Sequence, residues 1–242
     1  MSNQASSNRV IEQSNNQDLE VLHEDNHTIV VNKKPSDIVQ GDKTGDEPLS
    51  EKIKNFIKEK YNKPGNVFCG VVHRLDRPTS GALVFAKTTK AVSRLNTQFR
   101  DKETKKIYWA VVEKMPAKKE GKLEHFLKKN EKQNKSYASD TEVKGSKKAI
   151  LTYKWKASSD NYHLLEIQLE TGRHHQIRCQ LSTIGCIIKG DLKYGARRSN
   201  KDGSIHLHAR LLEYTHPTTK ERISVTAPVP QEPLWQFFEE KG

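Results

Sequence analysis

One polar stretch enclosed by two apolar runs places the strongest constraint on this chain. Residues 67–72 lead into it and residues 82–86 lead out of it, and both runs have the apolar character of buried strands. The enclosed stretch reads His73-Arg74-Leu75-Asp76-Arg77-Pro78-Thr79-Ser80-Gly81. Loops held between rigid strands often carry binding and catalytic groups, and the arginines on either side of Asp76 would keep its carboxylate ionised. The spacing alone leaves a second interpretation open, a surface turn with ordinary ion pairs.

The charge of the chain favours a polyanionic partner. The net charge of the 242 residues is +12, but residues 1–50 hold four basic and nine acidic residues, a net of −5. The remainder therefore carries 38 basic and 21 acidic residues, a net of +17. Nucleic acid is the commonest partner of such a basic body, although a soluble basic protein without a nucleic-acid partner would have the same composition.

The central stretch resembles the signature of the RluA family of RNA pseudouridine synthases. The shared positions are His73-Arg74-Leu75-Asp76, Thr79-Ser80-Gly81 and Ala86-Lys87. The resemblance implies isomerisation of uridine to pseudouridine in structured RNA, tRNA or rRNA, with Asp76 as the catalytic carboxylate. It also implies an α+β fold, in which helices flank a mixed, mostly antiparallel central sheet with the active site in a central cleft. Short connections between successive predicted strands independently favour such a sheet.

Two further segments extend the resemblance. Residues 106–112 match the family context of an active-site tyrosine, here Tyr108, although strand propensity alone would explain a sheet aromatic. Residues 171–178 match a family segment whose last arginine, here Arg178, pairs with the catalytic aspartate; a solvent-facing helix arginine is the alternative. The family has a small hydroxyl residue where this chain has His174.

The resemblance also implies a set of substrate contacts. They are His73, Arg74, Leu75, Arg77, Thr79, Arg173 and His175. The target base must leave its stack to reach such a site, and the resemblance implies that Arg74 inserts into the gap. A phosphate contact from Arg74 is an equally good interpretation, since such contacts are common.

The remaining sequence predicts one catalytic domain. Residues 1–18 are polar and predict a disordered tail, and residues 19–242 predict the catalytic domain, with no room before the first strand for the S4-type domain of many relatives. Apolar residues at helical spacing predict helices beginning at Pro48 and near Thr88. Residues 116–148 are Lys-rich and predict a loop-rich arm. The segment after Asn32 departs from the family, because Lys34 is extra and Asp37 stands where glycine is common.

The expected reaction needs neither cofactor nor metal, because no group and no electron enters or leaves. His206 and His208 could share a strand face, but no third ligand completes a metal site, and the three cysteines lack C-x-x-C spacing. No apolar run approaches the ~20 residues of a membrane span. We therefore expect a cytoplasmic monomer whose partner is RNA, without DNA or membrane. A basic RNA-binding protein without activity is the alternative.

Overall fold

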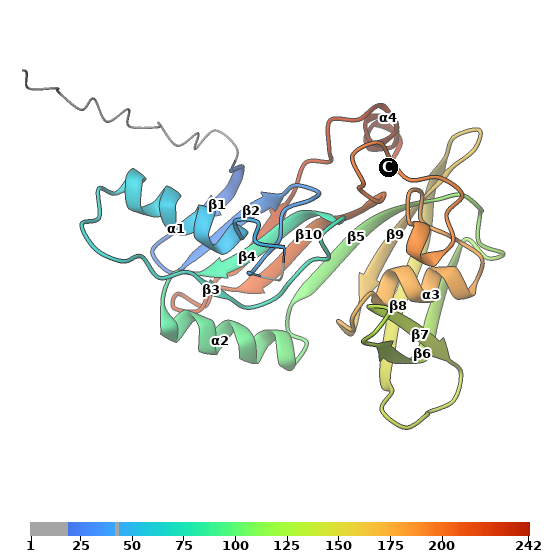
Figure 1. The fold of residues 1–242 in the computed structure, drawn as a ribbon, viewed down its shortest axis with the longest axis horizontal. Coiled ribbons are helices and arrows are strands. Elements are labelled where there is room, and N and C mark those ends of the chain that lie inside the picture. Colours follow the sequence, from blue (N-terminus) through green and yellow to red (C-terminus); the bar gives the residue numbers. More distant parts are fainter. Residues whose placement is uncertain (1–18, 42–43) are drawn as a thin grey trace, which may run out of the picture.

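The computed structural model describes residues 19–41 and 44–242, and a single twisted sheet runs through this part of the chain (Figure 1). Within these ranges the sheet has 11 strands in the order β1-β2-β4-β10-β5-β9-β8-β6-β7, with β3 beside β4 and β11 beside β10. The predicted tail, residues 1–18, lies outside the described residues.

The strands are β1 (Val21–Glu24), β2 (Thr28–Lys33), β3 (Gly70–Val71), β4 (Ser80–Ala86), β5 (Lys105–Val112), β6 (Glu120–Asn130), β7 (Lys135–Ser139), β8 (Lys147–Ser158), β9 (His163–Leu169), β10 (Leu207–Thr215) and β11 (Arg222–Thr226). The helices are α1 (Leu49–Lys60), α2 (Thr89–Arg100), α3 (Gln176–Thr183), α4 (Pro233–Lys241) and the short 3-10 helix η2 (Leu192–Tyr194).

The sheet is antiparallel except at its centre, where β4 and β10 run parallel. With four α-helices around it, this mixed sheet confirms the predicted α+β class. Each helix within the described ranges is too short or too polar to span a lipid bilayer.

Local sequence explains how the first helices begin and which face they bury. In α1 the stripe of Leu49, Ile53 and Ile57 is at most 2% exposed, as its helical spacing predicts. At the start of α2 the Thr88 hydroxyl accepts a hydrogen bond from the amide of Ala91 at 3.1 Å. This N-cap satisfies an amide that the helix itself leaves unpaired.

The two faces of the sheet are covered by different helices. The largest apolar cluster joins α1 and α3 to one face of the sheet, while α2 and α4 pack on the other face through two further clusters. Successive side chains of β5 point to opposite faces, because Tyr108 belongs to the first face and Trp109 to the second.

The central parallel pair brings three strands into close register. Gly81 of β4 lies opposite Ala209 of β10, and Ala209 lies opposite Tyr108 of β5. Gly81 has φ +116°, and a Cβ there would lie 2.4 Å from the Ala209 carbonyl oxygen. Only glycine allows this approach, which places the loop before β4 close to Tyr108.

The prediction of a loop-rich arm at residues 116–148 was wrong. This segment forms β6, β7 and the start of β8, and β6 pairs with β8 over eight residue pairs from Glu120↔Lys154 to Leu127↔Lys147. Leu127 is buried against α3 through Cys179, while the other face of β6 is solvated. Because β6 and β7 lie at the end of the sheet order, few apolar residues are needed, and composition alone suggested a loop.

Two other elements differ from the sequence analysis. The strand expected over residues 67–72 shrinks to the two residues of β3. The C-terminal helix α4 was not predicted, although Glu232 caps it by accepting from the Trp235 amide at 3.3 Å. The three cysteines are buried and free.

Candidate active site

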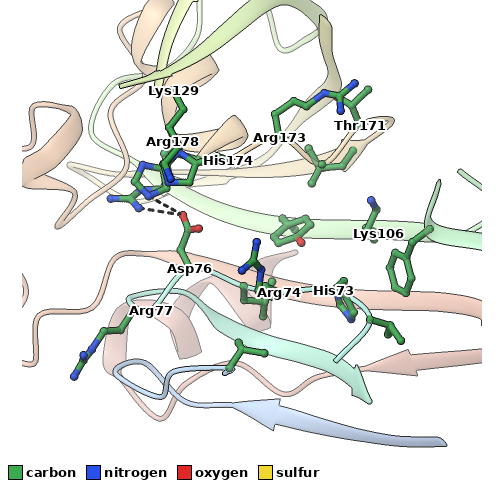
Figure 2. Close-up of a pocket in the computed structure, with 18 of the residues that line it drawn as sticks. His73, Arg74, Asp76, Arg77, Lys106, Lys129, Thr171, Arg173, His174 and Arg178 are labelled. Atoms are coloured by element: carbon green, nitrogen blue, oxygen red, sulfur yellow. Dashed lines mark hydrogen bonds and ion pairs between the residues drawn. The ribbon is translucent and has the colours of Figure 1, made fainter. Parts of the chain in front are cut away.

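A cleft of about 990 Å³ opens between the loop that precedes β4 and the start of α3. Figure 2 shows 18 of the residues that line it, and most of the lining residues come from the 72–78 loop, from β5 and from the 169–178 segment. These segments are far apart in sequence and meet because β10 lies between β4 and β5 in the sheet.

Asp76 and Arg178 meet at the centre of the cleft, 102 positions apart in sequence (Figure 2). The Arg178 Nη1 donates to Asp76 Oδ2 at 3.0 Å, while the Asp76 side chain remains 29% exposed. Its other oxygen, Oδ1, has no hydrogen-bond partner among the described residues. The carboxylate is thus held by one oxygen and open to the cleft at the other.

A second carboxylate fixes the arginine from behind. Arg178 donates through Nε and Nη2 to the two oxygens of Asp191, at 2.7 and 2.8 Å. Burial by itself would lower the pKa of Arg178, but the bonds and charges of Asp191 and then Asp76 raise it above its ordinary value. The bidentate pair sets the plane of the guanidinium, so that the third donor points at Asp76. The sequence analysis missed Asp191, for which an aspartate between Gly190 and Gly195 was the one available signal.

Lys33 supports the loop that carries Asp76. It is 1% exposed, and its ammonium donates to the carbonyl oxygens of Lys34, Arg77 and Thr79 at 2.9, 3.0 and 2.7 Å. Burial lowers the pKa of Lys33 to about 8, against the opposing charges of Asp37 and Asp76. The sequence analysis missed this residue too, although a lysine at the end of an apolar strand is an unusual position.

The turn after Lys33 also differs from the expectation. The residue in the left-handed region is Ser36, with φ 74°, and not Asp37, where the family pattern suggested glycine. The Ser36 amide donates to the Arg77 carbonyl at 3.0 Å, and Asp37 pairs with Lys52 at 2.8 Å. The altered turn therefore still contacts the loop that carries Asp76.

Tyr108 forms part of the cleft wall on β5. It is 8% exposed, and burial raises the pKa of its hydroxyl above the usual range, with a further contribution from the Asp76 charge. The residue is therefore a neutral phenol at neutral pH. An aromatic ring in this position offers a stacking surface to a planar nucleobase. Proton abstraction by a Tyr108 phenolate is disfavoured, because the hydroxyl keeps its proton.

His175 stands beside Asp76 as a neutral ring. Its Nε2 lies 3.7 Å from Asp76 Oδ2, and its Nδ1 lies 3.1 Å from the Tyr194 hydroxyl. Burial lowers the pKa of His175 to about 3, although the Asp76 charge acts in the opposite direction. The positive charge beside Asp76 is accordingly that of Arg178.

Sequence comparison identifies the family. The pattern described as RNA pseudouridylate synthase matches residues 27–183. The chain belongs to the RNA pseudouridylate synthase family. This match confirms the resemblance of the central stretch, and with it the prediction of an enzyme that isomerises uridine in RNA.

Individual relatives agree with this assignment. The ribosomal large subunit pseudouridine synthase D of Zymomonas mobilis subsp. mobilis is 32% identical over 225 residues, which are 88% of this chain and 70% of the relative. The tRNA pseudouridine synthase C of Haemophilus ducreyi is 30% identical over 239 residues, 91% of this chain and 94% of the relative. The solved structure of human RNA pseudouridylate synthase domain containing 4 has a TM-score of 0.75 at 22% identity and covers 90% of this chain and 92% of its own, which shows the same fold.

In this synthase His73 and Arg74 differ in how firmly they are held. His73 stacks on Phe99 with ring centroids 4.4 Å apart, and its Nε2 accepts from the Val84 amide at 3.1 Å. Burial, helped by the charge of Lys106, lowers the pKa of His73 to about 3. Arg74 is exposed on the same loop and lines the cleft (Figure 2).

Three predicted substrate contacts need correction or restriction. Thr79 is 2% exposed and does not belong to the cleft lining that the described residues form, so its side chain cannot reach a substrate there. Leu75 lines the cleft but is 8% exposed and packs in the main core cluster. The Arg77 guanidinium points away from Asp76 and pairs with Asp46 at 2.7 Å, which removes it as a second partner of Asp76.

The cleft of this family member is basic. Its lining holds the acidic residues Asp76 and Glu170 and nine basic residues: Arg74, Arg77, Arg100, Lys102, Lys106, Lys129, Arg173, Arg178 and Lys193. Arg173 is additionally tethered, because its Nε donates to the Lys148 carbonyl at 2.9 Å. Such an excess of positive charge attracts a polyanion and steers it toward Asp76.

The two histidines of the H-x-H segment have other partners. His206 contacts Asn200 at 2.9 Å and Glu232 at 3.1 Å, and His208 contacts the hydroxyl of Ser80 and the Ala227 carbonyl. All four ring nitrogens are therefore engaged within the protein. In the part of the chain that the structure describes, no group of three or more His, Cys, Asp or Glu side chains has the arrangement of a metal site.

Proposed function

We propose that the cleft isomerises uridine within structured RNA, tRNA or rRNA, and that Asp76 is the catalytic carboxylate. The observation that carries this proposal is the array of Asp191, Arg178 and Asp76, in which a locked guanidinium presents one carboxylate to the cleft. An RNA-binding protein without activity has no need of such an array. The relatives named for large-subunit rRNA and for tRNA support the substrate class. We further propose residues 19–242 as one catalytic domain, acting as a cytoplasmic monomer.

The reaction is an isomerisation of the nucleotide. The bond between N1 and C1′ breaks, the base turns, C5 bonds to C1′, C5 loses a proton and N1 gains one, so that no atom or electron is exchanged with a cofactor. Asp76 can serve in one of two ways, by attacking C1′ as a nucleophile or by removing a ribose proton as a general base. Both routes need a carboxylate with one oxygen free to react, and Asp76 has such an oxygen in Oδ1, since Arg178 bonds to Oδ2.

The surrounding residues would receive a flipped base. Tyr108 would stack on the uracil ring, in keeping with a neutral phenol in the wall of the cleft. Arg74 has the exposure and the planar side chain needed to fill the gap that the base leaves. Arg173 and His175 would contact the nucleotide at the α3 side, and His73 would hold the shape of the loop.

Replacement of Asp76 tests the proposal. Asp76→Asn keeps the shape of the side chain but removes its charge, so pseudouridine formation in unmodified tRNA and rRNA transcripts should fall by at least about 10²-fold. RNA affinity should change little. The matched control is Asp46→Asn, which removes a carboxylate that is exposed and pairs with Arg77.

The readout is nucleoside analysis of the digested transcripts by mass spectrometry, with binding measured on the same RNA. A folded Asp76→Asn protein that retains more than about a tenth of the wild-type rate would contradict the catalytic assignment. Mapping pseudouridines in RNA from cells with and without the protein would then identify the modified position.

A further inference from the structure

The ring of His206 is buried beside the segment that carries Asp191, outside the cleft lining formed by the described residues. His206 directly precedes β10 and is 3% exposed, and its ring stacks on Trp235 of α4 with centroids 5.2 Å apart. Its amide donates to the Lys189 carbonyl oxygen, and its own carbonyl oxygen accepts from the Val111 amide, both at 2.9 Å. His206 is therefore fixed between β5, α4 and the residues just before Asp191.

The partners of the ring define its protonation state. Nδ1 of His206 lies 2.9 Å from Nδ2 of Asn200, and Nε2 lies 3.1 Å from a carboxylate oxygen of Glu232. The side-chain oxygen of Asn200 accepts from the Lys189 ammonium at 2.8 Å, so its Nδ2 is the atom that faces the ring. Because an amide nitrogen can only donate, Nδ1 accepts and the ring proton lies on Nε2. The bridge formed by Asn200, His206 and Glu232 therefore requires a neutral His206.

Asn200 lies directly against the turn that leads into Asp191. A Cβ on Gly190 would be only 2.8 Å from Nδ2 of Asn200, while Lys189 donates to the oxygen of the same amide. Asn200 thus contacts both residues that precede Asp191, whose carboxylate sets the plane of the Arg178 guanidinium. Loss of this support would let Asp191 shift, together with the guanidinium that orients the catalytic carboxylate.

The segment 204–206 also contacts the loop that carries Asp76. The Ile205 amide donates to the Pro78 carbonyl oxygen at 3.1 Å. The Ser204 carbonyl oxygen accepts from Nδ2 of Asn200 at 3.0 Å. One short segment therefore contacts the loop of Asp76 on one side and the support of Asp191 on the other.

We propose that neutral His206 is a positioning residue for the reaction, because through Asn200 it holds the turn that leads into Asp191. This support keeps Arg178 aligned with Asp76. The inference rests on the proposed function, since it concerns the rate of the same reaction. A protonated ring would present a hydrogen on Nδ1 to the donating amide of Asn200, and the two groups would have to separate.

The charges around the ring act on it in opposite directions. Burial lowers the pKa of His206 below its ordinary value of 6.5, the bond and charge of Glu232 act to raise it, and the charge of Lys189 lowers it. The net direction is downward, so the bridge is intact at neutral pH and is lost as the pH falls below 6.5. The titratable groups that face the ring or its partners come from each neighbouring element: Glu232 of α4, Lys189 before Asp191, Asp202 of the 196–204 loop, Glu113 after β5 and His208 of β10.

Two substitutions of His206 separate the hold on Asn200 from the packing of the ring. In His206→Asn an amide oxygen replaces Nδ1 and still accepts from Asn200, whereas the longer side chain of His206→Gln reaches Glu232 instead. With an unmodified tRNA or rRNA transcript, kcat should fall by about tenfold or more in His206→Gln and in Asn200→Ala, with little change in KM. His206→Asn should recover most of this loss. An equal fall in both His206 variants, or no fall in His206→Gln or Asn200→Ala, would overturn the positioning role.

Hydrogen exchange measures the same hold without reference to activity. The amides of residues 190–196 should exchange about fivefold faster than in the wild type in His206→Gln and Asn200→Ala, and at nearly the wild-type rate in His206→Asn. The matched control is Glu239→Gln, which removes a carboxylate of α4 that pairs with Arg210 at 2.9 Å. It should leave this exchange unchanged, and an equal increase in the control would overturn the role of the bridge.

Protonation of His206 is followed by the fluorescence of Trp235, because an imidazolium quenches a stacked indole more strongly than a neutral ring does. In the wild type, both fluorescence and kcat should fall as the pH decreases below 6.5, and both should fall less in His206→Asn. Identical pH profiles in the two proteins would show that the neutral state of His206 is not what the bridge requires.

The outcomes distinguish the two proposals. If the exchange pattern is found but the wild-type protein forms no pseudouridine, only the proposed function fails, and the hold on Asp191 stands. If pseudouridine forms but exchange is the same in all variants, only the positioning role of His206 fails.

Discussion

Removal of Arg178 should cost both stability and activity, for two different reasons. In Arg178→Met the side chain keeps its apolar stem but loses the donors to Asp191 and Asp76. Asp191 is 1% exposed and would become a buried charge without its partner. Breaking a buried pair in this way costs about 3–5 kcal/mol. The open carboxylate of Asp76 would lose the group that orients it, which should lower kcat by on the order of 10²-fold.

A second substitution separates the two effects. In Arg178→Met/Asp191→Asn the buried charge is gone, so the free energy of unfolding should recover by about 2 kcal/mol or more, while kcat remains low because nothing orients Asp76. Arg178→Lys should recover little activity, because a single ammonium cannot replace three donors that serve two carboxylates.

Urea unfolding and single-turnover pseudouridine formation measure the two quantities on the same preparations. If the double variant regained wild-type turnover together with stability, Arg178 would be a structural partner of Asp191 alone. If Arg178→Met unfolded at the wild-type urea concentration, the buried-pair argument would be wrong.

Three more outcomes follow from single residues. Gly81→Ala should lower the free energy of unfolding, measured in urea, by at least about 2 kcal/mol, because the new Cβ would lie 2.4 Å from the Ala209 carbonyl oxygen. The control is Gly203→Ala, since Gly203 also has a positive φ, +72°, but has open space around its Cα. Equal losses in the two variants would show that the clash with Ala209 is not the cause. Lys33→Met should cost about 2–4 kcal/mol. Because burial lowers the pKa of Lys33 from 10.5 in the unfolded chain to about 8 in the folded protein, the wild type should gain stability relative to this variant as the pH rises from 8 to 10.5. Because the pKa of His73 is lowered from 6.5 to about 3, its contribution to stability is lost as the pH falls from 6.5 to 3. In His73→Gln the free energy of unfolding should therefore fall less steeply with decreasing pH over this range. An unchanged pH dependence would refute this.

The structure also explains why the strands of residues 116–148 were not predicted, whereas the central motif was. The central motif combines apolar runs with an uncommon order of polar residues, and both signals are local. The hairpin of β6 and β7 has a weak local signal, since its polar face is solvated and its inner face needs few apolar residues such as Leu127. It is stable because it pairs with β8 and packs against α3, contacts that propensity does not encode.

The sequence by itself determined the α+β class, the helices α1 and α2, and the choice of Asp76, Tyr108 and Arg178 as candidate site residues. These features depend on periodicity and on a long motif, which neighbouring residues carry. Only the tertiary structure decided that Asp191 locks Arg178, that Lys33 holds the loop of Asp76, and that Thr79 is turned into the core. Such contacts join residues from 13 to 102 positions apart, and the order of strands in the sheet, above all the insertion of β10 between β4 and β5, brings them together. No local sequence pattern predicts the order of the strands in the sheet, because that order results from the packing of the whole chain.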